Sequence, residues 1–112
     1  MLRSRVGFHT ALERFAWEND LQQVYFDPPG NVLMKYPCIV YEEVGMDIKP
    51  ADNIPYIRHN EYELKIITND ADSRLPYLLE KAFPYAVRYS GRRYISDNLH
   101  HYVLNCRVST KL

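Results

Sequence analysis

Two adjacent histidines, His100 and His101, are the residues best suited to bind a metal ion. Neighbouring residues on a strand point to opposite faces of a sheet, so the two imidazoles cannot easily share one ion. A structural zinc site also needs four ligands at a recognisable spacing, and the sequence has no CxxC or HExxH motif. We therefore expect no metal ion, and nothing in the sequence indicates another cofactor.

Carboxylates could perform acid–base chemistry if the strands that carry Glu42, Glu43, Glu61 and Glu63 were neighbours. Such chemistry needs a pocket that separates the pKa values of two carboxyl groups. Carboxylates on the solvent face of a sheet are usually only hydrated. No GxGxxG or GxxxxGK[ST] motif is present to bind phosphate.

Cys106 with His100 or His101 could form a nucleophile and base. This chemistry requires an exposed thiol with a lowered pKa. Both cysteines, Cys38 and Cys106, lie instead in apolar runs, where a free cysteine behaves as a small buried hydrophobe. We therefore expect no catalytic residue and no enzymatic activity.

A basic cluster, Arg88, Arg92 and Arg93, alternates with Tyr89 and Tyr94. Basic side chains that alternate with aromatic rings can hold phosphates and stack bases, so the three arginines are candidate nucleic-acid contacts. The favoured alternative is an edge strand that positive charge protects from aggregation.

Length and composition indicate one globular domain over residues 1–112 with a net charge of zero. The charge is uneven, because residues 1–73 carry seven basic and twelve acidic side chains and residues 74–112 carry seven and two. Ten tyrosines suit either strands or a protein interface. No apolar stretch is long enough for a transmembrane helix, and the N-terminal residues do not resemble a secretory signal, so we expect an intracellular setting.

The elements that must position these residues follow from periodicity. Phe8, Leu12 and Phe15 recur at helical spacing, whereas Leu64 and Ile66 alternate with charged residues as in a half-buried strand. We predict helices at 2–19 and 73–83, with Asp72 or Ser73 capping the second. Strands are predicted at 21–26, 33–44, 56–68, 85–95 and 100–109.

The order α-β-β-β-α-β-β predicts an α+β fold. We expect a small antiparallel or mixed β-sheet with the N-terminal helix and the second helix packed on one face. The polar segment 45–55, with two prolines and a glycine, is interpreted as a long loop that joins two paired strands. It is longer than a hairpin needs, which suggests that it reaches a partner.

Several segments together resemble a known family. They are MKYPCIVYE (34–42), ADNIPY (51–56), YELKII (62–67), DSRLP (72–76) and SDNLHHYVL (96–104), with Asp47 and Asp70. The pattern, which covers roughly residues 22–106, resembles the tail completion or tail terminator (head–tail joining) proteins of long-tailed bacteriophages and prophages.

The resemblance implies an α+β domain that forms a ring, usually a hexamer, at the head–tail junction of the virion. Such a ring stops growth of the tail tube and joins the tail to the head. The implied partners are further copies of the chain, the tail tube protein and the head-closure or connector protein. DNA is only a passing cargo, no membrane is involved, and assembly occurs in the host cytoplasm. The alternatives are a head-closure or minor capsid protein of the same neck, or a small DNA-binding module that uses Arg88, Arg92 and Arg93.

A ring protein needs contacts between subunits and between rings. We expect these in the segment 45–58 and in the turn 96–98; the alternative is that both are solvent loops with turn-forming residues. The candidate interface residues are Asp47, Lys49, Asp52, Asn53, Arg58, Asp97 and Asn98.

Overall fold

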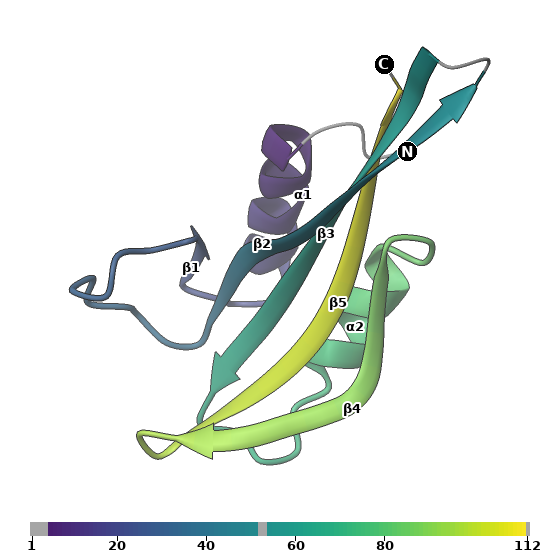
Figure 1. Ribbon diagram of the computed structural model, residues 1–112. Helices are drawn as coiled ribbons and strands as arrows, with labels where there is room; N and C mark the ends of the chain where they lie inside the picture. The colour runs from purple at the N-terminus through teal and green to yellow at the C-terminus, as the bar shows by residue number, and fades with distance from the viewer. Residues whose placement is uncertain (1–4, 52–53, 112) are drawn as a thin grey trace.

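The structure is a computed structural model that describes residues 5–51 and 54–111. Two helices cover one face of a five-stranded sheet (Figure 1). The elements are α1 (Arg5–Glu18), β1 (Gln23–Phe26), β2 (Cys38–Ala51), β3 (Ile54–Thr68), α2 (Leu75–Ala82), β4 (Val87–Ser96) and β5 (Leu99–Lys111). This order and the α+β class confirm the prediction.

The strand order in the sheet is β1-β2-β3-β5-β4. β1 runs parallel to β2, and all other neighbours are antiparallel, so the sheet is mixed. β1 ends at Phe26, because Asp27 adopts a positive φ and Pro28 and Pro29 follow it. β1 therefore covers the outer edge of β2 only from Cys38 to Tyr41.

The hydrophobic core lies between the helices and the sheet. The apolar stripe of α1, Phe8 to Ala16, is buried as its helical spacing predicts. The ring of Phe8 lies 5.7 Å from that of Tyr41 on β2, 6.0 Å from that of Tyr62 on β3 and 5.7 Å from that of Phe83 after α2. Both helices therefore pack on the same face, as expected.

The predicted loop at 45–55 is wrong. β2 continues to Ala51 and β3 begins at Ile54, and the two strands pair from Gly45↔Glu61 to Ala51↔Ile54. The strands stay paired through two register shifts. The first leaves Val44 without a paired residue on β3, and the second lies between Lys49 and Pro50. Met46 and Ile48 alternate with Asp47 and Lys49 as in a strand, but the glycine and the two prolines of the segment favoured the loop.

Other predicted boundaries shift for local reasons. The strand expected at 33–44 begins only at Cys38, directly after the cis Tyr36–Pro37 bond. The second helix begins at Leu75 with Arg74 at the capping position, not Asp72 or Ser73. Ser73 lies one residue earlier, where its hydroxyl accepts a bond from the Leu75 amide at 3.2 Å.

Residues 45–51, 54–61 and 107–111 form a three-stranded extension of the sheet, which we call the arm. It projects beyond α1 and gives the molecule a length of 51 Å against widths of 30 and 24 Å (Figure 1). The pairing of β4 with β5 extends only to the base of the arm, where the Arg107 amide donates to the carbonyl of Ala86. Among the described residues, no strand pairs with the outer edges of β2 and β5 in the arm.

Candidate protein interface

The arm carries three of the candidate interface residues. Asp47 and Lys49 lie on β2 opposite His59 and Ile57, and Arg58 lies on β3 opposite Ile48. Because paired residues point to the same side, Asp47 and Lys49 share the face away from the helices and Arg58 points to the other face. Asp52 and Asn53 lie outside the described residues.

A polar row crosses the arm on the face away from the helices. The Arg107 guanidinium lies 3.6 Å from the Asp47 carboxylate, and His59 Nδ1 is 2.7 Å from the Ser109 hydroxyl. Both members of the ion pair are at least half exposed, so the pair contributes at most about 1 kcal/mol. Arg107 was not among the predicted interface residues, because its place beside Asp47 depends on the pairing of β5 with β3.

Apolar side chains on β2 are the most unusual feature of the arm. Val44, Met46 and Ile48 are between 38% and 56% exposed. Met46 and Ile48 pair with Asn60 and Arg58, so they lie together on the helix-side face, beyond the reach of the core. Exposed apolar side chains grouped on one surface are typical of a contact with another protein. These residues were not predicted as contacts, because the segment was interpreted as a loop.

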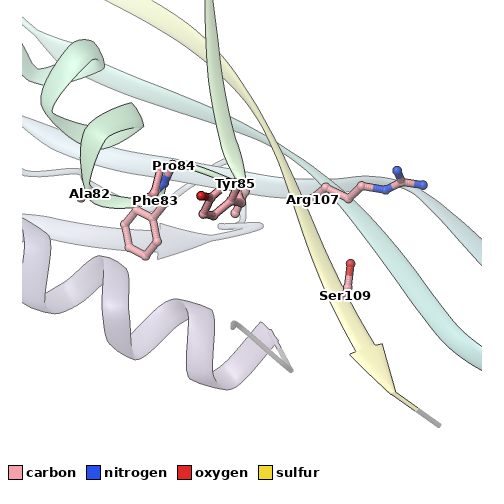
Figure 2. Close-up of a pocket in the computed structure, with 7 residues that line it drawn as sticks. Ala82, Phe83, Pro84, Tyr85, Arg107 and Ser109 are labelled. Carbon is pink, nitrogen blue, oxygen red and sulfur yellow. The ribbon is translucent and has the colours of Figure 1, made fainter.

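A hollow of about 550 Å³ lies at the base of the arm, beside the outer edge of β5. Figure 2 shows Phe83, Pro84 and Tyr85 of the α2–β4 connection on one side and Arg107 and Ser109 of β5 on the other. Ala82 and Ala86 complete the lining. Tyr85 is 95% exposed, so the hollow presents an aromatic and largely apolar wall to solvent.

The second predicted interface segment, the turn at Asp97 and Asn98, lies at the opposite end of the sheet from the arm (Figure 1). The two residues have φ values of 53° and 63°, as required for the tight turn of a two-residue hairpin. Aspartate and asparagine tolerate this left-handed conformation. The fold thus places the two predicted contact segments at the two ends of β5, so one partner surface does not easily cover both.

The three arginines of the basic cluster make separate contacts within the chain. Arg88 donates to the carbonyl oxygens of Pro84 and Val87, and Arg92 lies 3.8 Å from the Glu63 carboxylate. Arg93 donates to the carbonyl of Ala71 at 2.8 Å and packs over the ring of Tyr102. Arg93 pairs with Tyr102 on the helix side, whereas Arg88 pairs with Asn105 on the other side. The structure therefore does not bring the three guanidinium groups to one surface.

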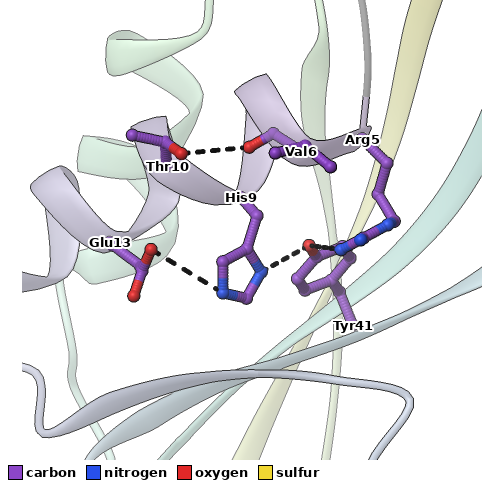
Figure 3. A network of polar contacts seen from close by, with 6 residues as sticks. All are labelled: Arg5, Val6, His9, Thr10, Glu13 and Tyr41. Atoms are coloured by element: carbon purple, nitrogen blue, oxygen red, sulfur yellow. Dashed lines mark hydrogen bonds and ion pairs between the residues drawn. The ribbon is translucent and has the colours of Figure 1, made fainter.

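A polar network joins α1 to β2 (Figure 3). The Tyr41 hydroxyl lies 2.6 Å from His9 Nδ1 and accepts from Arg5 at 3.5 Å. His9 Nε2 is 3.9 Å from the Glu13 carboxylate. Burial raises the pKa of Tyr41, while the bond from Arg5 acts in the opposite direction. These contacts hold the N-terminal half of α1 on the strand that continues into the arm.

Replacing Tyr41 with phenylalanine is expected to lower the free energy of unfolding by about 1 kcal/mol, because a partly buried hydrogen bond to His9 is lost. Urea unfolding followed by circular dichroism measures this change. The matched control is Tyr85→Phe, since the Tyr85 ring is almost fully exposed. An equal loss in both variants would show that the network does not stabilise the docking of α1.

The two thiols are buried, as the apolar runs around them predict. Burial raises the pKa of Cys38 and of Cys106 from 9.0 to about 12. The thiolate is the reactive form of cysteine, so near neutral pH both groups are protonated and shielded.

Stability should therefore fall as the pH rises above 9. An unfolded chain ionises its thiols near pH 9, whereas the folded chain keeps them protonated up to about pH 12. At pH 10 this difference costs about 1 kcal/mol for each thiol. Urea titrations between pH 8 and pH 10 measure the slope, which should flatten in the Cys38→Ala, Cys106→Ala double variant. If the slope of unfolding free energy against pH were unchanged in the double variant, the loss of stability at alkaline pH would be due to other groups.

Within residues 5–51 and 54–111, no three His, Cys, Asp or Glu side chains are grouped so as to hold a metal ion. Neither α1 nor α2 is long and apolar enough to cross a membrane, in the part of the chain that the structure describes. No protein-family model and no curated protein matches this chain.

Proposed function

We propose that this chain is a structural protein of the neck of a long-tailed phage, a tail terminator or completion protein. Copies of it form a ring that caps the tail tube and joins it to the head connector. The observation that carries the proposal is the arm, a three-stranded extension that projects beyond α1 and carries exposed apolar residues on β2. The resemblance of residues 22–106 to that family supports the same function.

The arm is poorly stabilised by its own contacts. From Gly45 to Pro50 every residue of β2 is exposed or half-exposed, and among the arm residues whose burial the structure describes only Val108 belongs to the hydrophobic core. A narrow β-ribbon with little buried surface is only marginally stable in water. A neighbouring protein that covered Met46 and Ile48 would remove this weakness, so the arm suits an assembly better than an isolated molecule.

The two sides of the arm differ, which favours a ring. β2, on one side of the arm, carries the exposed apolar residues Met46 and Ile48, whereas β5, on the other side, borders the hollow and carries Arg107. Unlike surfaces on two sides of one molecule make head-to-tail contacts, and these contacts form a closed ring when the rotation between neighbours closes.

Cryo-electron microscopy of phage particles, with the chain carrying a density tag, tests the proposal. The expected result is a single ring of tagged density at the head–tail junction, in contact with the last ring of the tail tube. Density on the head side alone would assign the chain to head closure. Untagged particles are the control, and the absence of tag density from purified particles would overturn the neck function.

A further inference from the structure

The outer edge of β2 is open from the point where β1 ends. β1 pairs with β2 only up to Tyr41, whose carbonyl accepts a bond from the Asp27 amide. Asp27 has a positive φ, and the chain turns away from the sheet there. Over the residues that the structure describes, no strand pairs with this side of β2 from Glu42 to Lys49, a stretch that we call the free edge. An open edge of this kind is a template for pairing with another strand.

The main-chain groups of Met46 and Ile48 point outward from the free edge. The Arg107 amide donates to the chain before β4, so it points away from β3. Main-chain groups alternate in direction along an antiparallel strand, so those of Val108 point toward Asn60 on β3 and those of Asn60 point back toward β5. Met46 faces Asn60 from the other side without exchanging main-chain bonds with it, and Ile48 follows two residues later.

Met46 is also the midpoint of the free edge. The bulge at 43–44 counts as one position, because only Tyr62 of β3 lies opposite it. Glu42 and Lys49 then lie at equal distances on the two sides of Met46. Two copies that pair their free edges in antiparallel directions around a two-fold axis at Met46 therefore cover the whole of both edges, with Glu42 of each copy opposite Lys49 of the other.

The charges at the two ends of the free edge are complementary. Glu42 and Lys49 are exposed, they lie on the face away from the helices, and neither makes an ion pair with a described residue. A hollow of about 180 Å³ adjoins Glu42 and has Asp27 and Glu63 in its wall. The second copy's Lys49 would reach this acidic hollow, and opposite charges on facing strands stabilise their pairing.

The apolar residues of the arm meet on the opposite face of the same contact. Met46 and Ile48 are 54% and 38% exposed and lie on the helix-side face. In the two-fold arrangement Met46 lies opposite the second copy's Met46 and diagonal to its Ile48, within reach of a long side chain. An axis one residue later would instead place the Asp47 carboxylates of two copies opposite each other, which repel.

We infer that the free chain forms a two-fold dimer in which the β2 edges of two copies pair antiparallel around Met46. The sheet then continues from one copy into the other, with main-chain hydrogen bonds at the joint. The inference goes beyond the proposed ring and does not rest on it. Met46 and Ile48 cannot cover a dimer partner and a ring neighbour at once, so the dimer must separate before a copy enters a ring.

Charge reversal tests the inference through the dimer dissociation constant, measured by sedimentation velocity over a concentration series. Glu42→Lys and Lys49→Glu should each raise the constant about tenfold, because each dimer loses two exposed ion pairs. The double variant should restore the original constant, since the same two positions then meet with their signs exchanged. The control is Glu18→Lys, an exposed position on α1 that should leave the constant unchanged.

Disulfide formation under mild oxidation tests the register. The added thiols of Met46→Cys lie opposite each other, whereas those of Ile48→Cys are four residues out of register and about 13 Å apart, beyond the reach of a disulfide. The native thiols of Cys38 and Cys106 are buried and protonated. The expected result is a disulfide-linked dimer from Met46→Cys and monomer from Ile48→Cys on a non-reducing gel.

Three results would overturn the inference. They are a monomeric unaltered protein at every concentration, a double charge variant that dimerises no better than the single ones, and a disulfide in Ile48→Cys but not in Met46→Cys. Unchanged circular dichroism spectra and melting curves establish that the variants are folded.

The dimer and the neck function fail separately. Tagged density at the head–tail junction from a chain that stays monomeric in solution would leave the neck function intact and overturn the dimer. A dimer with the expected charge and disulfide results, but without tagged density, would leave the edge pairing intact and remove the neck function.

Discussion

Replacing Phe8 with alanine is expected to lower the free energy of unfolding by about 3–5 kcal/mol. The side chain is fully buried, and its ring lies against the rings of Tyr41, Tyr62 and Phe83. It therefore joins α1, the central strands and the end of α2. Removing the ring leaves a cavity that these elements cannot close without moving relative to the sheet.

Urea unfolding of the unaltered protein and of Phe8→Ala measures this loss, and Trp17→Ala is the control. Trp17 lies on the same helix but is 72% exposed, so its replacement should change stability by only about 0.5 kcal/mol. Phe8→Leu should cost less than Phe8→Ala, because most of the apolar volume is retained. A loss of unfolding free energy below about 1 kcal/mol for Phe8→Ala would contradict the placement of α1 on the sheet, since removal of a fully buried ring lowers stability by more than that.

Shortening the arm is expected to abolish assembly while the core stays folded. In this variant residues 48–58 are replaced by Asn-Gly, so that Asp47 and His59 flank a two-residue turn and keep their pairing. The free energy of unfolding should change by about 1 kcal/mol or less, because none of the removed side chains whose burial the structure describes, at 48–50, 57 and 58, lies in the core. The subunit contact should be lost, since Ile48 and most of the β2 edge are gone.

The measurement is ring formation by the tagged variant at the head–tail junction, with its melting curve as the check on folding. The matched control replaces Asp97 and Asn98 by Asn-Gly, which retains the tight β4–β5 turn and leaves the arm unchanged. Normal rings with the shortened arm would show that the contact lies elsewhere. A loss of assembly in the control would instead implicate the turn.

The sequence was sufficient where one face of an element is buried. The helical spacing of Phe8, Leu12 and Phe15 and the alternation of Leu64 and Ile66 predict the elements that the structure contains, together with their buried faces. These patterns arise because a helix or strand that covers a core must separate apolar from polar residues at its own period. The α+β class and the order of the elements followed from them.

The interface residues were only partly accessible from the sequence. Asp47, Lys49 and Arg58 were chosen as loop residues, and they lie instead on paired strands with Arg58 on the opposite face from the other two. Met46 and Ile48 were not selected, because the segment that contains them was interpreted as a polar loop.

Local patterns therefore determined the helices, most strands and the buried cysteines, because each depends on which residues a single element must bury. Only the tertiary structure decided that β1 lies parallel to β2 and that β5 extends beside β3 into the arm. These features depend on which strands meet and where their pairing stops. The pairing is set by the packing of the whole sheet against α1 and α2, and no single segment of the sequence contains that information.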